Sequence, residues 1–381
     1  MWDLLASCAV DVVHIKKGPK RGGERPALDT TDLDSLWHRQ WLLSETSRVL
    51  LEAARTGDTP EVARSLDGLA KPDCCDTAGL TPLHAAAGRG FAEIVRLLLD
   101  KRATPDAPGG PLFNGPPSCL AASRGHADCL QLLVEADAHL EARGGESNWT
   151  PLHFACAEGH PNCARVIMDG CPHTTKVHEN RYGEHHVHEP LDLIANMRDS
   201  RGRLALHEAA LRQNPACVDM LIKGGFPSHD ERDAAGDGAL HLAASGPVED
   251  AGTVVCELLI ASKASPNLAA ANGETALHIA ARLGRPRMCT VLLVHGADPG
   301  AAEASQRLNP LHLAARKGST TACAALLEGR ADPHLVDARK NTPLMVSQSL
   351  ECSAVLCGAM RVNERNGYAV TDADGGGELA H

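Results

Sequence analysis

Aromatic residues are scarce in this chain of 381 residues, because Phe, Trp and Tyr together make up only 3% of it. The core must therefore be built from aliphatic side chains and alanine. No apolar stretch approaches the ~20 residues that a membrane-spanning helix needs. The apolar start of the chain is interrupted by Asp3 and Asp11, so we expect neither an export signal nor a membrane span. These absences predict a cytoplasmic protein, with the nucleus as the alternative.

Charge and cysteine usage narrow the class of protein further. The formal net charge of -11 at pH 7 argues against broad attraction to nucleic acid or to anionic membranes. The 14 cysteines would suggest disulfides in a secreted chain, whereas thiols stay reduced in a chain without an export signal. We therefore expect partners that are other proteins, and cysteines that are free.

One ten-residue phrase, TPLHAAAGRG at residues 81–90, recurs along the chain. Further copies begin at Pro116, Thr150, Leu204, Gly238, Thr275, Asn309 and Thr342. Subtraction of these numbers gives intervals of 33 to 37 residues, with one longer interval of 54 between Thr150 and Leu204. A fixed period of this size is typical of a solenoid that carries an insertion.

Each period predicts two short helices. Thr81 is suited to cap the first helix, Pro82 to occupy its first position, and Gly90 to end it. A second helix follows, with one apolar stripe made by Ile94, Val95, Leu98 and Leu99. Isolated helices shorter than ~12–15 residues are marginal in water, so each pair must stack on its neighbours.

The recurring Thr-Pro-Leu-His-x-Ala phrase, its glycine turn, the Leu-Leu pair and the Gly-Ala-Asp-Pro of residues 296–299 resemble ankyrin repeats. The resemblance covers about residues 47–356 and implies an all-α fold, a solenoid of stacked helix-turn-helix units with β-hairpin loops. It also implies an amino-terminal cap at residues 50–66, seven units and a shortened last unit. The second copy departs from the pattern at Pro116-Pro117, where we expect an irregular first turn.

Three segments follow from this assignment. We predict an amino-terminal arm at residues 1–46, the repeat array at 47–358 and a flexible tail at 359–381. Trp37 and Trp41 lie one helical turn apart in the arm, which predicts a helix that covers the first unit; a docking motif for another protein is the alternative. The basic stretch at residues 15–25 is either a linker or a nuclear-import signal.

Most cysteines and histidines recur with the phrase. Cysteines occupy the apolar stripe of the second helix at 129, 163, 217, 256, 289 and 323, which predicts core residues rather than a metal or redox site. Six histidines share the fourth position of the phrase: His84, His153, His207, His241, His278 and His312. The resemblance implies that they form hydrogen bonds between neighbouring units.

The long interval contains a histidine-rich insertion. Its zinc-capable residues are Cys171, His173, His178, His185, His186 and His188. They lack a regular ligand spacing, so we favour a surface loop over a metal site, and we expect no cofactor. No phosphate-binding loop, nucleophile elbow, zinc-protease or kinase motif is present, so we expect no enzyme and no small-molecule substrate.

The resemblance also indicates a binding surface, because the first helices and hairpin tips of such arrays line one face. The helix ends there are Arg89, Arg124, Glu158, Arg212, Arg282, Arg316 and Lys317, and the hairpins add Trp149, Arg203 and Leu308. This mostly basic strip suits an acidic or phosphorylated protein segment. The alternatives are that the charges only keep the helix ends soluble, and that Trp149 packs on the next hairpin.

The sequence therefore predicts a non-catalytic scaffold or adaptor that binds partner proteins, as a monomer or as part of a larger complex. A substrate-recognition subunit of a ubiquitin ligase is one alternative. A metal-binding regulatory protein that uses the histidine-rich insertion is another.

Overall fold

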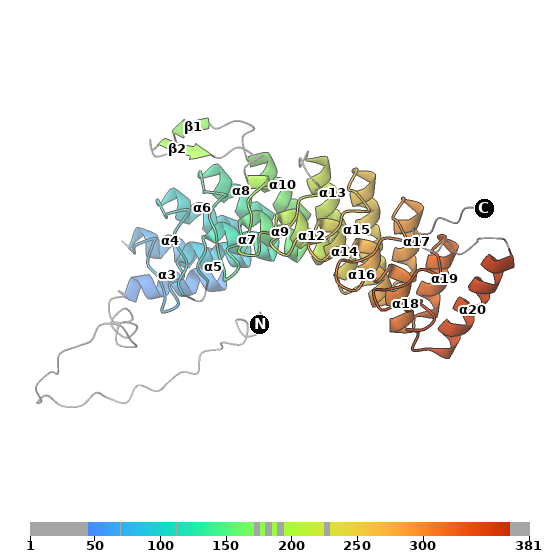
Figure 1. Ribbon diagram of the computed structural model, residues 1–381. Helices are drawn as coiled ribbons and strands as arrows, with labels where there is room; N and C mark the ends of the chain where they lie inside the picture. Colours follow the sequence, from blue (N-terminus) through green and yellow to red (C-terminus); the bar gives the residue numbers. More distant parts are fainter. Residues whose placement is uncertain are drawn as a thin grey trace, which may run out of the picture. The chain divides into compact units, whose positions relative to one another are not determined.

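The computed structural model describes residues 45–68, 70–111, 113–170, 194–224 and 229–365, with the backbone of two strands at 176–179 and 185–188. The regular secondary structure of the described part is almost entirely helical, and its helices follow one another in pairs (Figure 1). The all-α class is confirmed. None of the described helices is both long and apolar enough to cross a membrane.

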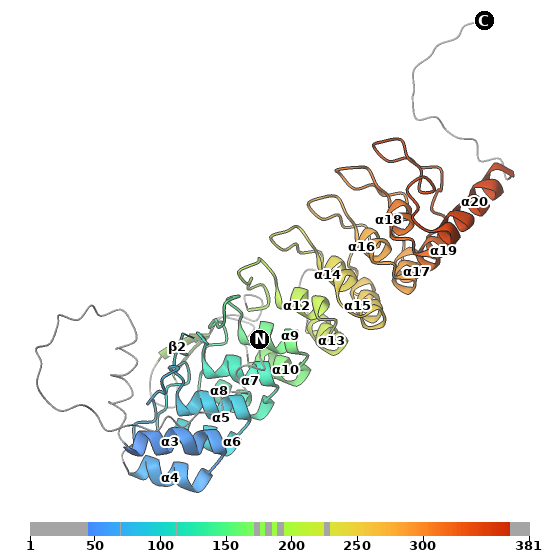
Figure 2. The ribbon, with the colours of Figure 1, turned by 90° about the horizontal axis from the view of Figure 1, so that it is seen from below.

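The helices form two rows. The first row contains α3 (Glu45–Thr56), α5 (Pro82–Arg89), α7 (Pro117–Arg124), α9 (Pro151–Glu158), α12 (Ala205–Leu211), α14 (Ala239–Ser245), α16 (Ala276–Leu283) and α18 (Pro310–Lys317). The second row contains α4 (Thr59–Asp67), α6 (Ala92–Asp100), α8 (Ala127–Glu135), α10 (Pro161–Gly170), α13 (Pro215–Lys223), α15 (Glu249–Ala261), α17 (Pro286–Val294), α19 (Thr320–Glu328) and α20 (Leu350–Arg365). Each helix packs against the next helix of its own row, as two views of the array show (Figures 1 and 2).

Local signals account for the helix ends. In α5 the Thr81 hydroxyl accepts a hydrogen bond from the backbone N–H of His84, and Gly90 closes the helix with a φ of 81°. This left-handed conformation favours glycine. The first turn of α7 differs from that of α5, as expected. Pro117 takes the first helical position as Pro82 does, but no side chain caps the helix, and the Cys119 N–H donates to the Pro116 carbonyl only three residues back.

The core is one continuous apolar layer between the two rows. The stripe predicted for α6 is confirmed, since Ile94, Val95, Leu98 and Leu99 are at most 2% exposed. The six cysteines predicted for this layer are also buried, at 129, 163, 217, 256, 289 and 323, and the described cysteines are free thiols. Small alanines fill much of the first row, which lets neighbouring helices approach closely.

The last unit is half a unit. Its Thr342 phrase forms turns rather than a first helix, and Met345 within it is 70% exposed. Its second helix, α20, runs to Arg365, beyond the array end predicted at residue 358. No further described helix covers this phrase, so the burial that stabilises the other first helices is missing here.

The insertion between α10 and α12 contains a two-stranded antiparallel sheet, β1 (Lys176–Glu179) and β2 (His185–His188), with Val177 opposite Val187. The sequence predicted only a loop here. Cys171 and His173 lie outside the described residues, and for His178, His185, His186 and His188 only the backbone is described. The predicted arm with Trp37 and Trp41, and the tail beyond residue 365, also lie outside the described part.

Candidate protein-binding surface

In every full unit except the second, a histidine on the first helix forms a hydrogen bond with the hairpin of the next unit. The ring Nε2 of His84 lies 3.1 Å from the carbonyl oxygen of Gly115 in the following unit. The same contact joins His153 to Arg203, His207 to Glu231, His241 to Glu274, His278 to Leu308 and His312 to Asn341. The second unit has Cys119 instead, whose thiol makes long contacts to the carbonyls of Ala142 and Trp149. The predicted bonds between units are confirmed.

The hydrogen bonds of His153 determine which of its ring nitrogens carries the proton. Its Nδ1 accepts the backbone N–H of Thr150, so the proton must sit on Nε2, which donates to the Arg203 carbonyl at 3.0 Å. Burial lowers the pKa of His153 to about 4, despite the opposing effect of that carbonyl. Burial likewise lowers the pKa of the other five histidines of the phrase. These rings are neutral structural links at pH 7.

Backbone hydrogen bonds also connect most consecutive hairpin tips. In each bond the backbone N–H of one tip donates to a backbone carbonyl oxygen of the preceding tip, at 2.8 to 3.0 Å. The pairs are Ser200 with Ser147, Ala234 with Arg201, Ala304 with Asn272 and Ala338 with Gln306. The tips follow one another as a series of loops beside the first row (Figure 2), and these bonds tie most neighbouring tips together. We call the surface made by these tips and the ends of the first-row helices the hairpin face. Its tips are residues 145–148, 200–202, 234–236, 271–273, 304–307 and 338–340.

The predicted helix-end charges are at the surface. Arg89, Arg124, Glu158, Arg212, Arg282, Arg316 and Lys317 are all exposed. Arg282 is paired, since its Nε lies 3.5 Å from Oε1 of Glu274 in the hairpin of its own unit. This contact shows that helix ends and hairpins share one face.

The carboxy-terminal hairpins add basic residues that sequence reasoning missed. Arg307, Arg339 and Lys340 are exposed at two adjacent tips. The acidic residues of the same hairpins, Glu303 and Asp337, are only 7% and 8% exposed. Their carboxylates accept backbone N–H groups of their own turns. At the two tips the exposed charged side chains are therefore basic, although Asp298 and Asp332 are exposed in the turns that lead into these hairpins. We call Arg282, Arg307, Arg316, Lys317, Arg339 and Lys340 the basic end of the hairpin face.

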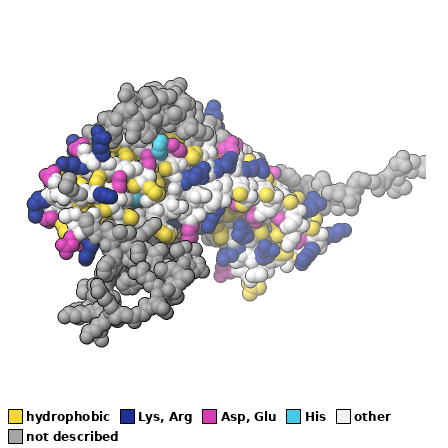
Figure 3. Space-filling view, turned by 90° about the vertical axis from the view of Figure 1, so that its left-hand side faces the viewer, with side chains coloured by type: hydrophobic (Ala, Val, Ile, Leu, Met, Phe, Trp, Pro, Cys, Tyr) yellow, Lys and Arg dark blue, Asp and Glu magenta, His cyan; other side chains and the backbone are white. Residues whose placement is uncertain are grey.

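The opposite end of the array is different. Seen from the side of α3 and α4, basic, acidic and hydrophobic side chains are interspersed (Figure 3). On that side Arg55 is paired with Asp76, and Arg64 with Glu61 at 2.7 Å. No charge of one sign dominates there, so the basic end is a local feature of an acidic protein.

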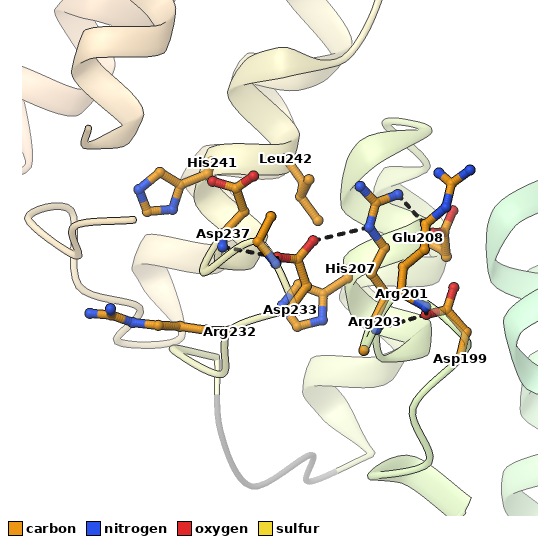
Figure 4. A network of polar contacts seen from close by, with 12 residues as sticks. Asp199, Arg201, Arg203, His207, Glu208, Arg232, Asp233, Asp237, His241 and Leu242 are labelled. Carbon is orange, nitrogen blue, oxygen red and sulfur yellow. Dashed lines mark hydrogen bonds and ion pairs between the residues drawn. The ribbon is translucent and has the colours of Figure 1, made fainter. Parts of the chain in front are cut away.

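Two of the three predicted hairpin contacts are not available as surface groups. Leu308 is 5% exposed and belongs to the core, which corrects its assignment as a tip residue. Arg203 has a side chain that is 14% exposed and that pairs with Glu208 and Asp233, each at 3.1 Å (Figure 4). Glu208 stands where other units have an apolar residue such as Phe154 or Leu242.

In this buried ion network, the carboxylates around Arg203 accept hydrogen bonds both from backbone N–H groups and from the Arg203 guanidinium. Burial alone would raise the pKa of Asp233, but its hydrogen bonds with the Asp237 backbone and the Arg203 guanidinium outweigh burial and lower that pKa. Asp199, in the preceding hairpin, accepts the backbone N–H groups of Arg201 and Arg203. Arg203 thus joins two neighbouring units, and its role is structural.

Trp149 is half-buried. Its ring meets Phe154 edge-on with centroids 5.2 Å apart, and its Nε1 donates to Asp199 Oδ2 at 3.0 Å. The geometry matches the alternative in which this side chain packs on the adjacent hairpin. Trp149 therefore fixes the position of the hairpin tip that follows the insertion.

No cluster of three or more His, Cys, Asp or Glu side chains in the described part of the chain is placed to hold a metal ion. The histidine-rich insertion is not covered by this finding, so its metal binding stays a prediction.

Comparisons with known proteins agree with this geometry. The family model of ankyrin repeats in three copies matches residues 50–115, 111–177, 206–303 and 248–337. An Arabidopsis thaliana protein described as an E3 ubiquitin-protein ligase, XBAT31, is 30% identical over 146 residues, which are 38% of this chain and 29% of that protein. The nuclear factor NF-kappa-B p105 subunit of Gallus gallus is 27% identical over 164 residues, which are 43% of this chain and 14% of that protein.

Solved structures give a similar result. The human ASB11 ankyrin repeat domain covers 64% of this chain and 97% of its own, with 20% identity and a TM-score of 0.51. The ankyrin repeat domain of Bcl-3 covers 63% of this chain and 97% of its own, with 23% identity and a TM-score of 0.49. At 20% identity, the likeness to the ASB11 domain shows the fold alone. The chain spans less than a third of each of the two curated relatives named above.

Proposed function

Because the chain belongs to the ankyrin-repeat family, we propose that it is a non-catalytic scaffold that holds partner proteins on its hairpin face. Ankyrin repeats form a protein-interaction domain. The linked hairpin tips and the histidine contacts hold this face in register before any partner binds, which lowers the entropy lost on binding.

We further propose that the partner segment is acidic or phosphorylated and that it binds the basic end. The observation that supports this most directly is the exposure of Arg307, Arg316, Lys317, Arg339 and Lys340 beside buried, occupied carboxylates. Guanidinium groups bind carboxylates and phosphates in a bidentate manner, which adds geometric selectivity to charge. Attraction between exposed charges weakens with salt, so binding should weaken as ionic strength rises.

A pair of charge reversals tests this proposal. We expect Arg316→Glu with Arg339→Glu to weaken the binding of a fluorescein-labelled glutamate- and phosphoserine-rich peptide at least about tenfold, as measured by anisotropy. The control is Arg96→Glu with Arg165→Glu, which makes the same change in net charge at exposed positions of the second row. Equal loss in both variants, or no loss in either, would contradict the basic end as the binding surface.

The likeness to XBAT31 supports a second candidate, in which the array presents bound substrates to a ubiquitin ligase. The recruiting element would then lie in residues 1–46, outside the array. Affinity purification of the full chain and of the chain without residues 1–46 tests this idea. If both forms retain partner proteins but neither retains a ligase, the second candidate is wrong while the scaffold proposal stands.

A further inference from the structure

The last two helices bring two thiols into contact. Cys323 on α19 and Cys352 on α20 lie 29 residues apart in the sequence, and their sulfur atoms are 2.9 Å apart. A disulfide bond is ~2.05 Å long, so an approach of less than ~1 Å would allow the bond to form. We propose that this pair is an oxidisable dithiol, which hydrogen peroxide converts to a disulfide that fastens α20 to the array.

While α20 is packed against α19, the two thiols are protected from oxidants. Both thiols are 0% exposed, and burial raises the pKa of Cys323 well above its usual value. The reactive thiolate of Cys323 is therefore scarce while α20 stays packed, and neither sulfur atom is accessible to peroxide. Oxidation must begin when α20 moves away from α19 and exposes Cys352 to water.

The end of the array is where such an opening costs least. In a solenoid each unit contacts only its neighbours, so a terminal unit can open without disturbing the rest. The last unit also lacks a first helix, and Leu350 at the start of α20 is 91% exposed. The pair Cys156 and Cys217, on α9 and α13, is also buried, but it lies inside the array and has no such route.

The chemistry balances with peroxide as the sole oxidant. The Cys352 thiolate attacks one peroxide oxygen, which breaks the O–O bond and gives a sulfenic acid and hydroxide. When α20 closes again, the Cys323 sulfur attacks the Cys352 sulfur and displaces hydroxide. The two displaced hydroxides take up the two thiol protons, so two thiols and one peroxide yield one disulfide and two water molecules.

Peptide mapping of the full chain tests the proposal. The protein is treated with hydrogen peroxide in a Cys357→Ser background, alkylated in denaturant and digested without reductant. We expect a peptide pair joined through Cys323 and Cys352, reversed by dithiothreitol and absent in Cys352→Ser. The internal comparison is the Cys156 and Cys217 pair, which should stay reduced over the same time. A link between Cys156 and Cys217 at the same rate, or a link from Cys323 to Cys289, would overturn the proposal.

Hydrogen exchange then tests the mechanical consequence. In the oxidised protein, amide exchange in α20 should slow by at least about tenfold, because the cross-link limits the opening of that helix. Exchange in α5 should not change. If the disulfide forms but α20 exchanges at its former rate, the bond does not fasten the helix and that part of the inference fails.

Discussion

Acid should weaken the array through its buried histidines, and His153 offers the sharpest test. Its pKa rises from about 4 in the folded chain to the ordinary value of 6.5 on unfolding. The unfolded chain therefore binds a proton that the folded chain excludes, and stability falls as pH drops through 6.5 toward 4. The gap between the two pKa values corresponds to about 3 kcal/mol, of which about 2 kcal/mol is lost between pH 7 and pH 5.

The fluorescence of Trp149 allows the unfolding of the unit that contains His153 to be measured separately. Trp149 directly precedes the Thr150 cap that His153 holds, and its fluorescence reports on this unit once Trp2, Trp37 and Trp41 are replaced by Phe. Urea unfolding would be followed at pH 7 and pH 5 for this background and for His153→Gln. We expect the variant to lose about 2 kcal/mol less than its parent between the two pH values.

His295→Gln, which replaces an exposed histidine outside the contacts between units, is measured in the same way as the control. An equal loss for the parent and His153→Gln would refute the reasoning, as would a parent that becomes more stable at pH 5. Either result would mean that His153 is already protonated in the folded chain or that its proton does not affect folding.

Two further substitutions test the core and the ion network. Leu98→Ala should lower the free energy of unfolding by about 2–5 kcal/mol through the cavity it leaves, whereas Val294→Ala, at a site 76% exposed, should cost less than about 0.5 kcal/mol. Equal urea midpoints for these two variants would contradict the placement of the core. Arg203→Met should cost about 3–5 kcal/mol, because Glu208 and Asp233 then stay buried without their cation. A thermal unfolding midpoint equal to that of the parent would show that the network does not stabilise the array.

The parts of this fold that the sequence predicts are those with local causes. A Thr-Pro start and a glycine end act within one helix, so the phrase at residues 81–90 marks α5 without knowledge of anything else. The burial of the second-helix cysteines was also predictable, because these cysteines occupy positions of the apolar stripe that recurs in each unit. The half unit at the end was predicted only as a shortening, since the loss of its first helix depends on which neighbours cover it.

The candidate site was harder to predict, because accessibility depends on contacts between units. Arg203 has the appearance of a tip residue, but Asp233, which pairs with it, comes from the next hairpin. Leu308 occupies the same place in its own unit and is buried. The exposed Arg307, Arg339 and Lys340 do carry a signal, since each lies shortly before a copy of the phrase, but exposure itself cannot be deduced from that position.

The histidine contacts give the array a direction. Every ring on a first helix reaches toward the carboxy-terminal neighbour, so removing units from the start leaves no remaining ring without its acceptor. Removing the final half unit would instead deprive His312 of the Asn341 carbonyl. The last unit has no first-row helix in the described part, but it has the hairpin that supplies the Asn341 carbonyl to His312. Deletion of the last half unit therefore breaks a histidine contact, whereas deletion of the first helix pair breaks none.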